Sequence, residues 1–246
     1  MGIKVGIIMG KVRRLMWGLL AVAAVAAGAL FLHKPVTTAP PPSAVATPTP
    51  APGPLDGLAV CVDPGHGGYD GGAYGVSGTP EKEINLAVAQ ALAEALQSRG
   101  ARVILTRNSD TALADEGAER KRRDLQARVD AAENADIFLS IHMNEYRTAA
   151  ESGPQVFYRK GQADSRLLAG FLQQAMNDAL RPARPRSAHT GEYYLLEHLQ
   201  IPAVLVECGF LSNPAEERRL LDGDYQRQVA ESIAAGVTEF VQAQRP

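Results

Sequence analysis

The stretch LAVCVDPGHGG, residues 58–68, is an apolar run that ends abruptly in proline and glycine. A short apolar run bounded by turn residues predicts a buried strand that opens into a loop. The glycines allow this loop to turn sharply, and they leave the imidazole of His66 exposed. Because ligands of open α/β sheets bind beyond the carboxyl ends of the strands, the stretch predicts both a sheet and a site at its edge.

Outward from this stretch, strand-like and helix-like segments alternate. Residues 81–99 carry apolar side chains at helical spacing and stop at Gly100. The expected strands are 58–63, 102–106, 137–141, 155–158 and 203–206, the expected helices are 81–99, 119–134, 164–180 and 225–242, and 193–196 is a short strand or turn. The alternation predicts an α/β three-layer sandwich in which helices flank a mostly parallel central sheet.

The N-terminus reads as an export signal. Basic residues precede an uncharged apolar run at 15–32, which as a helix would span roughly 27 Å, enough to cross a hydrocarbon core. The basic flank predicts that everything after residue 34 lies outside the cytoplasmic membrane. A cleaved signal peptide is the alternative, with a small-residue site at 27–29, but this site lies inside the apolar run, which favours an uncleaved transmembrane anchor.

The anchor is expected to be separate from the folded part. Residues 35–54 hold half of the chain's 16 prolines, which favours an extended spacer. The predicted organisation is a cytoplasmic tip and anchor or signal helix at 1–34, a linker at 35–54 and a folded catalytic domain at 55–246. The chain would therefore act outside the cytoplasm, either anchored to the membrane or exported after signal cleavage.

Charge and cysteine content exclude two classes of protein. A net charge of -2 and an isoelectric point near 6.2 argue against a nucleic-acid partner, which requires a clustered basic face. Two cysteines, Cys61 and Cys208, are too few for a disulfide scaffold. Each lies in an apolar run without a second ligand at metal spacing, so both are expected to be buried free thiols.

Three segments each place a metal-competent residue near a strand end or a helix start. His66 follows the first strand, Glu81 begins the first helix of the folded part, and His142 follows the apolar run at 137–141. Alone, each residue has a structural interpretation: a loop histidine, an acid that favours the helix dipole, and a core histidine. Together, two imidazoles and one carboxylate form a common catalytic Zn²⁺ set that leaves a fourth position for water.

Glu207 ends the apolar run 203–206 and is a candidate general base. A carboxylate in such a place is costly to bury without a partner, which a nearby zinc and its water would supply. Partial burial would also raise its pKa toward the range of a general base. The structural alternative is a glutamate that caps a loop through backbone hydrogen bonds.

Four ordered motifs give the chain a family resemblance: VDPGHGGYDGGAYG, EKEINLAVA, SIHMN and PAVLVECGFLSNPAEE. With them, residues 58–240 resemble the zinc-dependent N-acetylmuramoyl-L-alanine amidases of bacterial cell walls (amidase type 3), and most closely the compact amidases that act on spore-cortex peptidoglycan. The resemblance implies hydrolysis of the amide between N-acetylmuramic acid and L-alanine in peptidoglycan. It matches His66, Glu81 and His142 to the zinc ligands and Glu207 to the catalytic glutamate.

The sequence names no protein regulator. Some members of this family carry an inhibitory helix before the catalytic glutamate. Between His142 and Glu207 only one clear helix is expected, at 164–180, and it is needed for the core. We therefore expect no built-in occluding insertion.

Five further sites have candidate roles. Asp63 and Asn144 either support the ligands or make ordinary loop hydrogen bonds. His189 either lines a substrate groove or is an ordinary surface residue. Arg107 is expected to be a structural ion-pair partner. Residues 120–123 are expected to be a solvated basic helix face, with weak attraction to anionic wall polymers as the alternative.

Two other functions compete with the amidase. A zinc peptidase of the carboxypeptidase type would place a glutamate three residues after its first histidine, but position 69 is tyrosine. A catalytically inactive wall-binding protein would be expected to have lost at least one of the four site residues, and all four are present. Reaction products and zinc dependence separate these alternatives.

Overall fold

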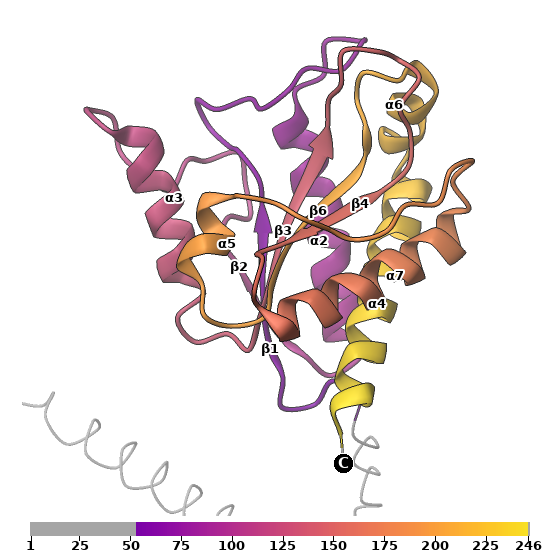
Figure 1. The fold of residues 1–246 in the computed structure, drawn as a ribbon. Helices are drawn as coiled ribbons and strands as arrows, with labels where there is room; N and C mark the ends of the chain where they lie inside the picture. The colour runs from indigo at the N-terminus through magenta and orange to yellow at the C-terminus, as the bar shows by residue number, and fades with distance from the viewer. Residues whose placement is uncertain (1–52, 246) are drawn as a thin grey trace, which may run out of the picture. The chain divides into compact units, whose positions relative to one another are not determined.

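The apolar stretch at the start of the folded part forms strand β1 (Ala59–Pro64), in which every residue is buried. The computed structural model describes residues 53–245. There β1 belongs to a six-stranded sheet of order β2-β1-β3-β6-β4-β5, whose strands other than β5 are labelled in Figure 1. The other strands are β2 (Arg102–Leu105), β3 (Ile137–Asn144), β4 (Gln155–Tyr158), β5 (His189–Thr190) and β6 (Ala203–Phe210).

The sheet is mixed, and its parallel part carries the candidate site. Strands β2, β1, β3 and β6 pair in parallel, β4 runs antiparallel to β6, and β5 is parallel to β4. The predicted α/β class is confirmed. Within the part of the chain that the structure describes, no helix is long and apolar enough to cross a membrane. The predicted anchor and most of the predicted linker lie outside those residues.

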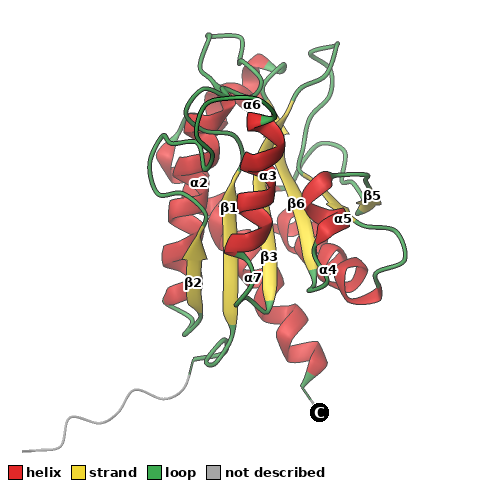
Figure 2. Cartoon of the chain, turned by 90° about the vertical axis from the view of Figure 1, so that its left-hand side faces the viewer, coloured by secondary structure: helices red, strands yellow, loops and turns green. Residues whose placement is uncertain are grey.

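Helices cover both faces of the sheet (Figure 2). They are α2 (Glu81–Gln97), α3 (Arg120–Ala131), α4 (Ala163–Leu180), α5 (Tyr194–His198), α6 (Pro214–Leu220) and α7 (Gly223–Gln244). Strand residues alternate between two cores, as a pleated strand requires. Val60, Leu139 and Val204 face the core that includes α2, α4 and α7, whereas Cys61, Phe138 and Leu205 face the core under α3 and α5.

Several elements differ from the sequence prediction. The expected strand or turn at 193–196 is the start of helix α5, whose Leu195 and Leu196 are buried. An apolar run this short is compatible with either a helix or a strand, so its conformation is set by packing in the folded chain. Strands β3 and β6 run past their predicted ends, so His142 and Glu207 lie inside strands rather than after them.

Both cysteines are free and buried, as predicted. They lie in the two different cores, Cys61 on one face of the sheet and Cys208 on the other. Burial and the charge of Asp63 raise the pKa of Cys61 to about 12, so its reactive thiolate is scarce at neutral pH.

A buried ionic network fastens α3 to the carboxyl end of β1. Asp63 accepts hydrogen bonds from Thr106 Oγ1 (2.6 Å), Ser140 Oγ (2.8 Å) and Arg128 Nη1 (2.7 Å). Arg128 also pairs with Asp124 (2.8 Å). Asp63 therefore stabilises the end of β1 and the loop that follows it. Its side chain bonds to Thr106, Ser140 and Arg128 and not to the metal-competent imidazoles.

Asp63→Asn should lower the free energy of unfolding by about 3 kcal/mol at pH 7, because the buried charge of Arg128 loses a partner. Burial opposes the ionised form of Asp63, but Arg128, Thr106 and Ser140 outweigh it and lower its pKa. Its stabilising effect is thus complete above the unfolded-state pKa of about 3.9 and is lost as the pH falls through the folded-state value. Urea unfolding should show the difference from wild type narrowing only below about pH 4.

Asp110→Asn is the matched control. Asp110 is half exposed and pairs with Lys82 (2.7 Å) at the start of α2. An exposed pair contributes less than about 1 kcal/mol. Equal losses in the two variants would contradict a special role for the buried network.

Candidate metal centre

The four residues singled out in the sequence line one pocket at the carboxyl edge of the parallel strands. His66 lies in the loop after β1, Glu81 is the first residue of α2, His142 belongs to β3 and Glu207 to β6. Residues at the start of α5 form another part of the pocket wall. Four segments that are distant in the sequence therefore meet where the fold predicts a ligand.

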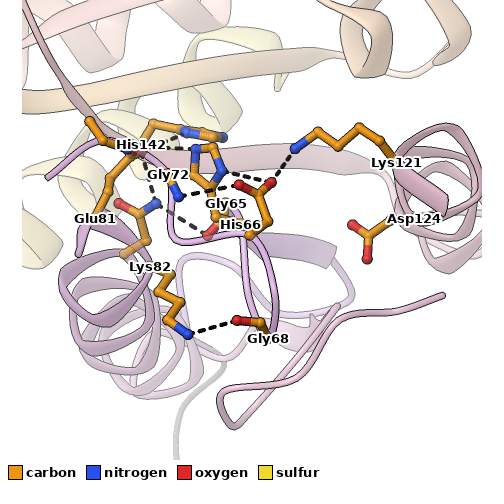
Figure 3. A network of polar contacts seen from close by, with 12 residues as sticks. Gly65, His66, Gly68, Gly72, Glu81, Lys82, Lys121, Asp124 and His142 are labelled. Atoms are coloured by element: carbon orange, nitrogen blue, oxygen red, sulfur yellow. Dashed lines mark hydrogen bonds and ion pairs between the residues drawn. The ribbon is translucent and has the colours of Figure 1, made fainter. Parts of the chain in front are cut away.

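Glu81 lies between the two imidazoles (Figure 3). Its Oε2 is 3.1 Å from His66 Nε2, and its Oε1 is 2.9 Å from His142 Nδ1. One ligand atom from each of the three residues lies within 4.8 Å of the others. This arrangement suits one small cation bound by all three side chains.

The Glu81 carboxylate is held by the backbone as well as by the histidines. Its Oε2 accepts from Ala73 N (2.9 Å), and its Oε1 accepts from Met143 N (3.1 Å) and Asn85 Nδ2 (3.0 Å). Burial favours the neutral acid, but His142 and His66 outweigh it and lower the pKa of Glu81. Glu81 is thus a buried carboxylate that is both ionised and fixed in position.

Two glycines make room for the ligands. A Cβ at Gly65 would lie 2.2 Å from His142 Cε1, and one at Gly72 would lie 2.4 Å from Glu81 Oε2. His66 itself has φ of 61°, in the left-handed region that few non-glycine residues adopt. The glycine-rich motif thus allows close packing of the imidazoles as well as a sharp turn.

Gly65→Ala should displace the His142 ring and weaken zinc binding by at least about tenfold, the scale seen when the support of a metal ligand is lost. Zinc affinity measured by competition with a chromophoric chelator tests this. Gly170→Ala is the control, because a Cβ at Gly170 meets nothing within 4 Å and favours helix α4. Wild-type affinity in Gly65→Ala would show that the ring can move without cost.

Glu207 lies opposite His142 in the register of two parallel neighbours, β3 and β6. A register irregularity follows directly, between His142 and Asn144, and such irregularities re-aim side chains at sites. Glu207 Oε2 is buried and has no hydrogen-bond partner among the described residues, so this oxygen is not the backbone cap of the structural alternative.

The environment of Glu207 is suited to a proton acceptor. Burial, reinforced by the charge of Glu81 and opposed by His142 and His66, raises its pKa to about 7. Glu81 and Glu207 thus have opposite shifts within one pocket. Such a division separates a permanently charged group from one that can exchange protons near neutral pH.

Asp70, for which no role was predicted, contacts His66. Asp70 Oδ2 lies 2.9 Å from His66 Nδ1, within ion-pairing distance, although the ring N–H does not point straight at it. Lys121 contacts the same carboxylate oxygen. The i, i+4 spacing of His66 and Asp70 was visible in the sequence, whereas the approach of Lys121 depends on the fold.

The basic run at 120–123 was expected to be a solvated helix face, but two of its side chains contact the loop that carries His66. Lys121 reaches Asp70, and the Arg120 guanidinium lies 3.6 Å from the centre of the Tyr69 ring. Arg122 is exposed and pairs only with Glu119 on its own turn (3.5 Å). Two of these basic side chains thus hold the His66 loop.

The other candidates fall into different places. Arg107 was expected to form an ion pair, but its buried guanidinium donates to the carbonyls of Pro64 (3.0 Å), Gly65 (2.9 Å) and Lys82 (2.9 Å). Asn144 lines the pocket. His189 is exposed on the short strand β5 and is not among the lining residues of the pocket.

Two further buried acids anchor loops beside the pocket. Glu217 accepts from Ser77 N (2.9 Å) and Ser77 Oγ (2.7 Å). Glu216 accepts from Gly153 N (2.9 Å) and Phe210 N (2.9 Å). Both acids belong to helix α6, which was not predicted. Asn213-Pro214 is nevertheless a helix-start signal in the sequence. In the structure, Asn213 caps the helix by accepting hydrogen bonds from Ala215 N and Glu216 N.

The donor set fits zinc. Two imidazoles and one carboxylate converge, which is a frequent catalytic zinc set. A second carboxylate faces the far nitrogen of one imidazole, as is usual for metal-bound histidine. Glu207 lines the same pocket, and its buried Oε2 has no hydrogen-bond partner among the described residues, so a water or a substrate group would complete the hydrogen bonds of this carboxylate.

Comparison with known proteins places the chain among related sequences. A family model described as N-acetylmuramoyl-L-alanine amidase matches residues 60–239. The germination-specific N-acetylmuramoyl-L-alanine amidase of Bacillus subtilis is 38% identical over 193 residues, covering 76% of this chain and 81% of that protein.

Solved structures agree. The CwlD amidase from Clostridioides difficile, determined in complex with the GerS lipoprotein, superposes with a TM-score of 0.73 at 34% identity, covering 76% of this chain and all of that one. The catalytic domain of CwlV from Bacillus (Paenibacillus) polymyxa var. colistinus gives a TM-score of 0.67 at 34% identity, covering 76% and 99%.

Proposed function

This chain belongs to the N-acetylmuramoyl-L-alanine amidase family and hydrolyses the amide between N-acetylmuramic acid and L-alanine of peptidoglycan, and we propose that it does so with zinc held by His66, Glu81 and His142. The observation that carries the proposal is the convergence of three ligand atoms within 4.8 Å. Glu207, on the strand beside His142, is the proposed general base.

Zinc bound there would polarise the scissile carbonyl and make a water molecule more acidic. One oxygen of the Glu207 carboxylate would take a proton from that water as the new carbon–oxygen bond forms. The same oxygen would then pass the proton to the nitrogen of L-alanine as the carbon–nitrogen bond breaks. The buried position of Glu207 and its pKa of about 7 suit both halves of this cycle.

The test is to incubate the purified chain with peptidoglycan and identify the products. New amino termini on L-alanine, abolished by a chelator and restored by zinc, are expected. Release of carboxyl-terminal amino acids would instead favour a zinc peptidase acting on stem peptides. Zinc binding without any cleavage would favour the inactive wall-binding alternative.

Peptidoglycan from spore cortex and from vegetative wall are two alternative substrates of this chain. Similarity to a germination-specific amidase supports spore-cortex peptidoglycan as a substrate of this chain. Digestion of cortex and vegetative wall in parallel tests this, and faster release from cortex is expected. Equal rates would indicate a general wall amidase.

We also propose that the chain works outside the cytoplasm and is anchored to the membrane by the apolar run at 15–32. The location of its substrate supports the first part, and the length of the run supports the second. Fractionation of cells that produce the chain should recover it at full length in the membrane. A shortened form in the medium would indicate signal cleavage instead.

A further inference from the structure

The two nitrogens of the His66 ring face two different carboxylates. Nε2 lies 3.1 Å from Glu81 Oε2, on the side of the three converging ligand atoms. Nδ1 lies 2.9 Å from Asp70 Oδ2, on the opposite side of the ring. One carboxylate is therefore a proposed ligand partner of His66, and the other stands behind the ring.

Asp70 is itself fixed in place. Its backbone exchanges hydrogen bonds with Gly67, at 2.9 Å and 3.1 Å. Its Oδ1 accepts from Gly72 N (3.2 Å), and Lys121 Nζ contacts its Oδ2. These contacts give the carboxylate a defined position against the imidazole.

Helix α3 holds this loop at several points. Arg128 donates to the carbonyls of His66 (2.7 Å) and Pro64 (2.9 Å). Arg120 stacks on Tyr69, and Lys121 reaches Asp70. Figure 3 shows Lys121 extending from its helix toward the cluster around His66. A helix that supplies none of the proposed ligands therefore contacts the backbone of one ligand and the carboxylate behind it.

We propose that Asp70 is a positioning residue for His66 and that Lys121 of α3 holds Asp70 in that role, so that this pair sets the affinity of the metal site. The inference rests on the proposed zinc site. A carboxylate at Nδ1 keeps the ring proton there, which leaves the Nε2 lone pair free for the cation. It also makes the imidazole a stronger ligand and fixes its orientation.

A neighbouring pair provides a matched control. Asp110 Oδ1 accepts from Gly68 N (2.7 Å), and its Oδ2 pairs with Lys82 Nζ (2.7 Å), which also donates to Gly68 O. Both aspartates thus tie the same loop to a lysine. Of the two, Asp70 faces an imidazole nitrogen, whereas the contacts of Asp110 are with Lys82 and the loop backbone.

The experiment measures the zinc affinity of the purified full chain by competition with a chromophoric chelator. Asp70→Asn keeps the size of the side chain and removes its charge, and it should weaken zinc binding at least about tenfold; Asp70→Ala should weaken it by up to about a hundredfold. Lys121→Met should give a smaller loss in the same direction. Asp110→Asn should stay close to wild type, and thermal unfolding without metal should be similar for all the variants.

The proposal is overturned if Asp70→Asn binds zinc as tightly as wild type, or if Asp110→Asn loses as much affinity. Should Asp70→Ala not fold, the Asp70→Asn result decides. The readout is independent of peptidoglycan digestion by the wild-type chain. A wild type that binds zinc but releases no L-alanine amino termini would refute the proposed function and leave this inference standing.

Discussion

Glu207→Gln should bind zinc as tightly as wild type while turnover falls by about 10²–10⁴-fold, the range attributed to a positioned general acid–base group. The amide keeps the shape of the side chain, but it cannot accept a proton from water at neutral pH. The measurements are the rate at which L-alanine amino termini appear and the zinc affinity of the same preparation. Glu207 is singled out because its buried Oε2 has no hydrogen-bond partner within residues 53–245 and because its pKa is raised to about 7.

Glu197→Gln provides the control for this prediction. Glu197 lies on α5 near the pocket, is exposed, and is not a lining residue. Its variant should retain wild-type turnover. Loss of zinc from Glu207→Gln would make Glu207 a fourth ligand and would reverse the proposed division of roles between it and Glu81.

His142→Ala should abolish turnover by a different route, because the site loses one of its three proposed ligands. The loss should be at least as large as that in Glu207→Gln, and zinc affinity should fall with it. Removing the metal from wild type with a chelator should also abolish turnover. Added zinc should restore the turnover of wild type, whereas the same zinc concentration should not restore the turnover of His142→Ala.

His189→Ala is the matched histidine control, since His189 is exposed on β5 and lies outside the pocket lining. It should bind zinc and turn over peptidoglycan as wild type does. Full activity of His142→Ala, or of a preparation shown to be free of metal, would exclude a metal-dependent mechanism built on these residues.

Much of the fold and the site could be predicted because the decisive signals are local. The run into Asp63-Pro64-Gly65 predicts a buried strand and a turn, and β1 is fully buried. Three functional side chains near strand ends and one at a helix start predict a common site, and all four line one pocket. The periodicity of residues 81–99 predicts a long helix, which the structure contains as α2.

The rest of the fold and of the site depends on contacts between segments that are distant in the sequence, which no local sequence pattern encodes. Lys121 and Asp70 are 51 residues apart and meet because α3 packs over the loop after β1. Arg107 was expected to form an ion pair with a carboxylate, but it donates hydrogen bonds to the backbone carbonyls of Pro64 and Gly65. The antiparallel β4 and the two-residue β5 are likewise set by sheet assembly, since residues 155–158 carry no signal for their direction.

The placement of His142 and Glu207 has a consequence for engineering and divergence. Their backbones are paired with each other across two neighbouring parallel strands, so their separation is governed by the inter-strand spacing of about 4.8 Å. Several other lining residues of the pocket, by contrast, come from loops, as do Ala73, Glu145 and Glu192, or from the start of the short helix α5. Loops can be exchanged, lengthened or mutated to accept a different stem peptide without changing the distance between a proposed ligand and the proposed base. Catalytic geometry and substrate preference can therefore evolve, or be designed, separately in this scaffold.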